Sequence, residues 1–246
     1  MTALSVNVNK IAVLRNSRGG KVPDVVRAAQ TCIDAGAHGI TVHPRPDMRH
    51  IKPDDVYALA EMLTVEYNLE GNPFGQSHEG YPGFMQLVEA VRPDQVTLVP
   101  DTDGQVTSDH GWNLGRNAAR LRPVIEQCHA AGCRVSLFMD PDPVDFSLAK
   151  DLGADRIELY TEAFANAWDT AARAWVVEKY RRATQAALAA GLKVNAGHDL
   201  NLQNLAGFLE IDGISEVSIG HALIADALEY GLSETVNRYL AVLKSS

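Results

Sequence analysis

The sequence has few cysteines, no long apolar run and no excess of positive charge. Its three cysteines, Cys32, Cys128 and Cys133, lack paired metal-ligand spacing, so buried free thiols in a reducing compartment are expected. No apolar stretch approaches the length of a membrane span, and the first ten residues lack the pattern of a secretory signal. A net charge of -9 argues against a general nucleic-acid or anionic-membrane surface. These absences predict a cytoplasmic protein with no nucleic-acid or membrane partner.

Two kinds of motif are also missing. The first predicted strand is not followed by G-x-G-x-x-G, which leaves an open doubly wound sheet as the second choice of fold. No H-x-H or H-E-x-x-H spacing occurs, so a metal site is disfavoured. What remains is a chain of 246 residues with 46% hydrophobic and 22% charged residues, which suits one (β/α)₈ barrel with a full core.

One pattern recurs four times along the chain: a helix ends in glycine and a short apolar strand begins within about three residues. The glycines are Gly36, Gly132, Gly153 and Gly191. Glycine suits this position because it adopts the left-handed conformation that commonly ends a helix. Seven positions after these glycines lie His43, Met139, Tyr160 and His198. The pattern therefore predicts α/β units, with two histidines at equal heights at the carboxyl ends of two strands.

Taken in order, the chain is predicted to contain eight strands and seven or eight helices, with no linker between domains. We therefore expect residues 1–246 to form a single (β/α)₈ barrel domain with extra helical segments. Residues 10–24 are expected to form a polar loop, and residues 71–82 a mobile lid over the site. Helices are expected over 142–152, 161–190 and 201–209, and the spacing of Trp168 and Trp175 in the second of these favours helix packing over a ligand site.

Polar residues are predicted at the inward-facing carboxyl ends of most strands, where the active site of such a barrel lies. An unpaired inward polar atom costs about 1–3 kcal/mol, so packing explains one such residue more easily than it explains many. A shared pocket satisfies them together, and histidines with glutamates make a suitable acid–base set. The residues placed there are Asn7, Asn9, His43, Glu70, Thr107, Asp140, Glu158, His198, Gly220 and His221.

The last two loops, GHDLN and GHALI, are candidates for a phosphate site, because each has a glycine followed by a predicted helix N-terminus. Asp199 is an awkward neighbour for phosphate and could cap the following helix instead. His43, Glu70 and His198 could alternatively form a two-histidine, one-carboxylate metal site. Arginines clustered at the same mouth make this alternative the weaker one.

Eight blocks of sequence, from the first strand to the last, resemble the pyridoxine 5'-phosphate synthase family. They are VNVNKIAVLRNSRGG, GITVHPRPDMRHI, YNLEG, LVPD..GQVTSDHGW, VSLFMD, IELYT, KVNAGHDL and IGHALI. The resemblance implies a (β/α)₈ barrel that condenses 1-deoxy-D-xylulose 5-phosphate with 3-amino-2-oxopropyl phosphate. The products would be pyridoxine 5'-phosphate, phosphate and water, formed without metal or organic cofactor. It also implies a homo-oligomer, an octamer in this family.

The same resemblance implies roles for individual residues. His43 and Glu70 would accept protons and His198 would donate one, while Glu158 is expected to assist as a further inward carboxylate. Residues expected to bind the phosphorylated substrates are Asn7, Asn9, Lys10, Arg18, Arg45, His50, Thr107, Asp199, Gly220 and His221.

The chain departs from the family pattern at three places. Asn9-Lys10 replaces the usual Asp-His, Asp199 replaces a glycine, and the 71–82 segment is longer than expected. Two other functions stay open: another phosphosugar-handling barrel enzyme, or a non-catalytic phosphometabolite-binding protein. A Schiff-base aldolase needs a lysine at a strand end, whereas Lys193 lies at a strand start. A binding protein has no need of the His43, Glu70 and His198 set.

Overall fold

The computed structural model describes residues 1–102, 104–142 and 146–245, and its centre is a closed parallel barrel. Each strand pairs in parallel with the next, and the first also pairs with the last, which confirms the predicted (β/α)₈ barrel. The strands are β1 Ala3–Asn7, β2 Gly39–Val42, β3 Glu66–Gly71, β4 Gln95–Leu98, β5 Arg134–Met139, β6 Arg156–Leu159, β7 Lys193–Ala196 and β8 Ile214–Ile219.

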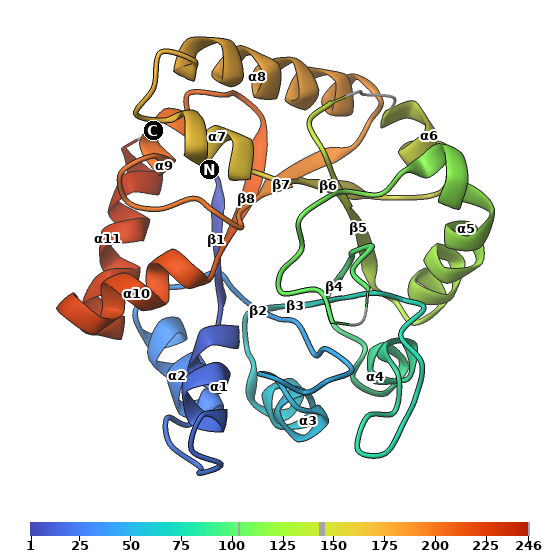
Figure 1. The fold of residues 1–246 in the computed structure, drawn as a ribbon, viewed down its shortest axis with the longest axis vertical. Coiled ribbons are helices and arrows are strands. Elements are labelled where there is room, and N and C mark those ends of the chain that lie inside the picture. Colours follow the sequence, from blue (N-terminus) through green and yellow to red (C-terminus); the bar gives the residue numbers. More distant parts are fainter. Residues whose placement is uncertain (103, 143–145, 246) are drawn as a thin grey trace.

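Helices surround this barrel as a ring (Figure 1). Within the described residues there are eleven, rather than the seven or eight expected. None of them is long and apolar enough to cross a membrane. The helices are α1 Asn9–Asn16, α2 Val25–Asp34, α3 Pro53–Met62, α4 Phe84–Val91, α5 Leu114–Ala130, α6 Phe146–Asp151, α7 Glu162–Ala167, α8 Arg173–Ala189, α9 Leu205–Phe208, α10 His221–Tyr230 and α11 Leu232–Lys244.

The hydrophobic core lies between the barrel and the ring of helices. Outward strand residues such as Leu4 and Ile40 are fully buried there, together with the apolar stripe of each helix. All four predicted helix-ending glycines have positive φ, between 81° and 101°, which confirms the turn that returns each helix to the sheet. The three cysteines are buried free thiols, as expected.

The barrel interior is polar and hydrogen-bonded in layers. Below the carboxyl ends of the strands, Ser5 and Thr41 share a hydrogen bond of 2.7 Å, and Asn68 donates to Thr41 at 3.2 Å. Nearer the amino ends, Arg156 donates to Glu216 at 3.1 Å. These hydrogen bonds link side chains of different strands across the interior and help to hold the strand ends in fixed register.

The segment predicted as a loop over 10–24 begins as helix α1. Its composition is polar, but Ala12 is fully buried and Arg15 forms a bidentate ion pair with Asp55 of α3. A helix this short is stabilised by such tertiary contacts rather than by its own propensity, which is why the local pattern missed it.

The helix predicted over 161–190 is two helices, α7 and α8, separated by a turn at Trp168–Ala172. Trp168 packs against Phe164 and under the Arg173 guanidinium, whereas Trp175 is 69% exposed on α8. The expected helix packing is therefore found for Trp168 but not for Trp175. The helix predicted over 201–209 is likewise reduced to α9, because asparagine side chains bind the backbone of 201–204. Of the helix predicted over 142–152, residues 143–145 lie outside the described residues, and α6 forms the remainder.

The 71–82 segment does not cover the central cavity as the predicted lid would. Tyr81 is buried and its hydroxyl donates to the Pro44 carbonyl, while Asn72 donates to the Asp101 carbonyl. Asn72 and His78 instead line a separate cavity of about 240 Å³ beside the β2 loop. The segment is therefore anchored to the neighbouring loops by its own side chains.

Candidate active site

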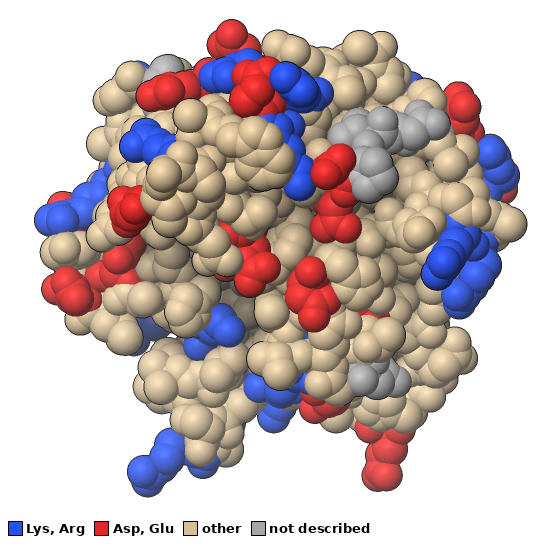
Figure 2. All heavy atoms as spheres, turned by 45° about the horizontal axis from the view of Figure 1, so that its top comes forward, with Lys and Arg blue, Asp and Glu red and all other residues tan. Residues whose placement is uncertain are grey.

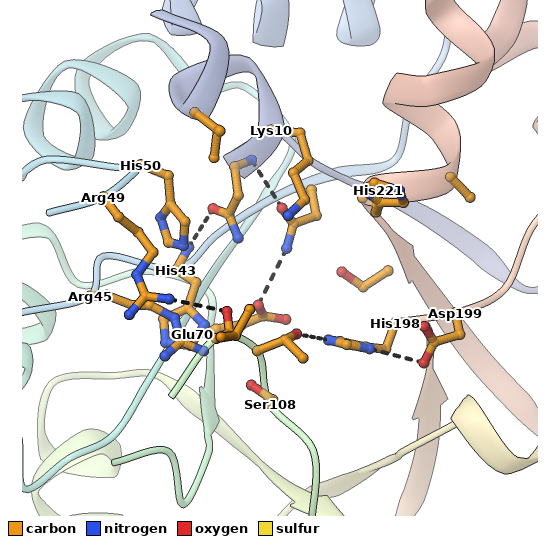
Figure 3. A pocket seen from close by; sticks show the side chains of 18 of the residues that line it. Lys10, His43, Arg45, Arg49, His50, Glu70, Ser108, His198, Asp199 and His221 are labelled. Carbon is orange, nitrogen blue, oxygen red and sulfur yellow. Dashed lines mark hydrogen bonds and ion pairs between the residues drawn. The ribbon is translucent and has the colours of Figure 1, made fainter. Parts of the chain in front are cut away.

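A cavity of about 620 Å³ opens at the carboxyl ends of the strands. Thirteen of the fourteen predicted site residues line it, and Figure 3 shows several of them converging from different elements. Figure 2 shows a hollow in this face with basic and acidic side chains at its edges. The predicted residues in the wall are Asn7, Asn9, Lys10, His43, Arg45, His50, Glu70, Thr107, Glu158, His198, Asp199, Gly220 and His221.

The fourteenth residue, Arg18, is exposed beyond the end of α1 and does not line this cavity. Asp140 also follows its strand without reaching the cavity wall. The roles assigned to all these residues stay predictions.

Two asparagines at the end of β1 form hydrogen bonds to residues at the ends of β2 and β3. The side-chain Oδ1 of Asn9 accepts a hydrogen bond of 2.9 Å from the His43 backbone N–H, and Asn7 Oδ1 accepts one of 3.0 Å from the Asn9 backbone N–H. The Asn7 amide also donates to Glu70 at 3.4 Å. The Asn9 side chain, at the position where the resemblance led us to expect aspartate, therefore holds the backbone of His43.

Two carboxylic acids lie at the floor of the cavity, Glu158 buried and Glu70 partly buried. Burial, followed by the charges of Asp101 and Glu216, raises the pKa of Glu70 to about 7, although His198 acts in the opposite direction. Burial and then the nearby carboxylate of Glu70 raise the pKa of Glu158 well above its ordinary value. Like charges this close do not ionise together readily, so the pair holds exchangeable protons near neutral pH.

The histidines on the β2 side are neutral. Burial and the Arg45 guanidinium hold the pKa of His43 well below its usual range. The same two causes, in the same order, lower the pKa of His50 to about 3, and His50 Nδ1 accepts a 2.9 Å hydrogen bond from the Ile51 backbone. His43 is therefore a neutral imidazole able to accept a proton. Anionic substrate beside Arg45 would make it a stronger base.

His198 differs from them in charge. Burial opposes its charged form, but hydrogen bonding to Asp199 and the negative charges of Asp199 and Glu70 outweigh this, so the pKa of His198 is raised. Its Nε2 lies 2.9 Å from the Thr107 hydroxyl and its Nδ1 lies 3.0 Å from Asp199 Oδ2. The pKa of His198 is raised and that of His43 is lowered, so the first suits a proton donor and the second a proton acceptor.

The backbone before His198 explains its placement and gives a testable prediction. A Cβ on Gly197 would overlap the backbone carbonyl of Ser218 on β8, so we expect Gly197→Ala to lower the free energy of unfolding by about 1–3 kcal/mol and to reduce activity. Gly115→Ala is the matched control. Its Cβ would meet nothing closer than 3.5 Å inside α5, so it should be neutral or stabilising by up to about 1 kcal/mol. Urea unfolding of both variants measures the difference, and equal stabilities would contradict the close approach of β7 and β8.

Cationic or amide groups lie at two ends of the cavity. At one end are Lys10 and the N-terminus of α10, which begins after Gly220. Ser218 Oγ beside it is buried without a hydrogen-bond partner among the described residues. At the other end are Arg45, Arg49 and His50 (Figure 3). Helix N-termini and arginines both suit phosphate oxygens.

Sequence reasoning missed three members of this site, namely Ser108, Ser218 and Asp101. Ser108 and Ser218 line the cavity, as does Arg49. Asp101, which is 5% exposed, forms an ion pair with Arg45, accepts a 2.7 Å hydrogen bond from Ser108 and lies 3.9 Å from His43 Nε2. Its position after the apolar β4 strand was a usable signal, but its partners come from the β2 loop, 56 residues away in the chain.

The alternative metal site is not supported by the geometry. Within the residues that the structure describes, no group of three or more histidine, cysteine, aspartate or glutamate side chains is placed to hold a metal ion. His43, Glu70 and His198 share the cavity without forming such a group.

Comparison with known proteins agrees with this geometry. Residues 4–245 match the family described as pyridoxal phosphate biosynthesis protein PdxJ. A protein of Xanthomonas campestris pv. campestris (strain B100) named pyridoxine 5'-phosphate synthase is 57% identical over 246 residues, covering 98% of this chain and 96% of the relative. A relative of the same name from Albidiferax ferrireducens is 55% identical, with 97% and 96% covered.

Solved structures with low identity share the fold. The tryptophan synthase alpha chain from Legionella pneumophila superposes with a TM-score of 0.67 at 13% identity, covering 99% of this chain and 92% of the other. Thiamine phosphate pyrophosphorylase from Pyrococcus furiosus gives 0.63 at 13% identity, with 99% and 96% covered. From the matched residues and the identity of its relatives, the chain belongs to the pyridoxal phosphate biosynthesis protein PdxJ family.

Proposed function

We propose that this chain is a pyridoxine 5'-phosphate synthase, which joins 1-deoxy-D-xylulose 5-phosphate to 3-amino-2-oxopropyl phosphate in vitamin B6 biosynthesis. The observation that carries the proposal is one cavity with acid–base groups in its middle and an anion-binding group at each end. Two phosphorylated substrates need two such ends, and successive condensations need proton transfer between them. The relatives at 54–57% identity bear the name of this enzyme.

The proposed chemistry divides among the residues by their charge state. The amine of one substrate attacks the ketone of the other, and water is lost as the imine forms. Glu70 and neutral His43 remove protons from carbon and nitrogen, and protonated His198 gives a proton to a departing oxygen. Glu158, with its raised pKa, holds or returns a proton to Glu70. Phosphate release and ring closure then give pyridoxine 5'-phosphate.

Each end of the cavity would hold one phosphate. Lys10, Ser218 and the amides of Gly220 and His221 would bind one of them at the start of α10. Arg45, Arg49 and His50 would bind the other. With the two phosphates bound in this way, the reacting carbon and nitrogen atoms would lie between Glu70, His43 and His198.

The testing experiment is an assay of the purified protein with both substrates and a chelator, following pyridoxine 5'-phosphate and released phosphate. We expect turnover with the chelator present, and loss of about 10²- to 10⁴-fold in His198→Ala. His129→Ala is the matched control, because His129 pairs with Asp155 away from the cavity. A folded protein that binds either phosphate ester without turnover would overturn the proposed reaction and indicate a different substrate.

A further inference from the structure

Asp199 follows His198 directly and turns its carboxylate toward that histidine. Asp199 Oδ2 lies 3.0 Å from His198 Nδ1. It does not cap the following helix, because α9 begins after Asn204. Both of its backbone groups are held: its N–H donates to Thr161 Oγ1 at 3.4 Å, and its carbonyl accepts from the Asn204 amide at 3.3 Å. The carboxylate therefore approaches His198 from a fixed piece of backbone.

The same backbone holds the histidine. His198 has a φ of 28°, in the left-handed region that side chains other than glycine rarely adopt. Gly197 before it passes against the Ser218 backbone, and its carbonyl accepts a hydrogen bond of 2.7 Å from Thr161. A strained backbone conformation persists only when the surrounding structure holds it in place. Here the contacts of Gly197 with Ser218 and Thr161 hold the backbone so that the His198 imidazole lies beside Asp199.

The pairing decides which nitrogen of His198 exchanges its proton. An ionised carboxylate only accepts hydrogen bonds, so Nδ1 must carry the hydrogen that lies between it and Asp199. Nε2 is then the nitrogen that gains or loses a proton. It lies 2.9 Å from the Thr107 hydroxyl at the cavity wall, where a substrate oxygen could replace Thr107.

We propose that Asp199 is a positioning residue that fixes His198 with its exchangeable proton on Nε2 and stabilises the protonated imidazole. The proposal rests on the function proposed above, in which His198 donates a proton. In that step the proton moves from Nε2 to a departing hydroxyl oxygen, and the C–O bond breaks with its electron pair on that oxygen. Glu70 takes a proton from the neighbouring carbon, and the C–H electron pair forms the new double bond. Water leaves, and His198 becomes neutral with Nδ1–H still hydrogen-bonded to Asp199.

Other groups face His198 from the surrounding elements. Glu70 on β3 and Asp101 after β4 favour the positive charge of His198. That charge in turn lowers the pKa of His43 at the end of β2. Tyr160 after β6 meets the imidazole edge-on, with ring centroids 5.5 Å apart, and Phe138 of β5 lies at 6.3 Å. Among the carboxylates, Asp199 makes a direct hydrogen bond to the ring, and its effect on the pKa of His198 is larger than that of Glu70 or Asp101.

The test compares Asp199→Asn, which keeps a hydrogen-bond acceptor but removes the charge, with Asp199→Gly, which removes both. We expect NMR titration of the His198 imidazole to show a proton affinity about tenfold lower in Asp199→Asn. The alkaline limb of kcat/KM should move to lower pH by the same factor, while KM changes little. Asp199→Gly should also lower kcat at its pH optimum by about 10- to 100-fold, because the tautomer is no longer fixed.

Glu162→Gln is the matched control, since the Glu162 carboxylate interacts with the Tyr160 hydroxyl at the same side of the cavity. Its titration and pH profile should match the wild type. An unchanged His198 titration in Asp199→Asn would overturn the proposal, and so would a rise in KM with an unchanged pH profile, which would make Asp199 a substrate-binding group. If the wild type forms no pyridoxine 5'-phosphate, the proposed function fails, whereas the titration still decides the role of Asp199.

Discussion

Glu70→Gln should lower kcat by about 10²- to 10⁴-fold while leaving the fold intact. Glutamine has nearly the same shape and can still accept the hydrogen bond from Asn7, but it cannot take up a proton. Because partial burial raises the pKa of Glu70 to about 7, it is poised to exchange protons near neutral pH. Steady-state rates with both substrates, measured with the wild type in parallel, test this expectation.

The same variant should change how stability depends on pH. The pKa of Glu70 is higher in the folded protein than in the unfolded chain, so its contribution to stability is complete below about pH 4.5 and is lost as pH rises through about 7. Glutamine does not ionise. At pH 8 the variant should therefore be more stable than the wild type, and the difference should shrink toward pH 5.

Urea unfolding at the two pH values measures this difference. Glu61→Gln, an exposed carboxylate on α3, serves as the control and should change neither activity nor the pH dependence of stability. Retained activity in Glu70→Gln, or a stability difference that does not depend on pH, would remove Glu70 from the acid–base set. A loss of activity accompanied by a gain in stability is typical of a residue kept for chemistry at the expense of the fold.

The barrel and the floor of its site were predictable because both follow from local periodicity. A helix-ending glycine, a short turn and an alternating strand leave little freedom in where the strand end falls. His43 and His198 could therefore be assigned to one end of the barrel from their offsets in the chain, and Glu70 from the alternation of its strand. Strand alternation likewise decided that Asn7 and Glu158 face inward, and both line the cavity.

What the sequence did not reveal depends on contacts between distant segments. Helix α1 forms because Arg15 meets Asp55 across 40 residues, and no local pattern predicts that pair. Arg18 was assigned by resemblance, yet it lies outside the cavity wall, because the backbone after α1 leads away from the strand ends. Asp199 was expected to contact phosphate or cap a helix, and its nearest partner proved to be the histidine beside it.

Asp101→Ala should lower the free energy of unfolding by about 3–5 kcal/mol, because it leaves the Arg45 guanidinium buried without its ionic partner. Arg45 is 6% exposed, and its remaining partner is the Gln105 carbonyl, at 3.1 Å. Catalysis should also fall, because Arg45 would no longer be held beside His43. Urea unfolding and steady-state kinetics measure the two effects. Glu234→Ala is the control: it breaks the exposed pair with Arg238 and should cost less than about 1 kcal/mol.

A double variant separates the structural contribution of this ion pair from its functional one. Replacing both partners, as Arg45→Met with Asp101→Leu, removes both buried charges, and stability should return to within about 1 kcal/mol of the wild type or exceed it. Substrate affinity should not return, because the phosphate would still lack Arg45. If the double variant is as unstable as Asp101→Ala, the two residues do not act as a pair. Restored stability without restored binding would mean that Asp101 is retained because it keeps a buried, permanently charged arginine at the end of the cavity where we propose that a phosphate binds.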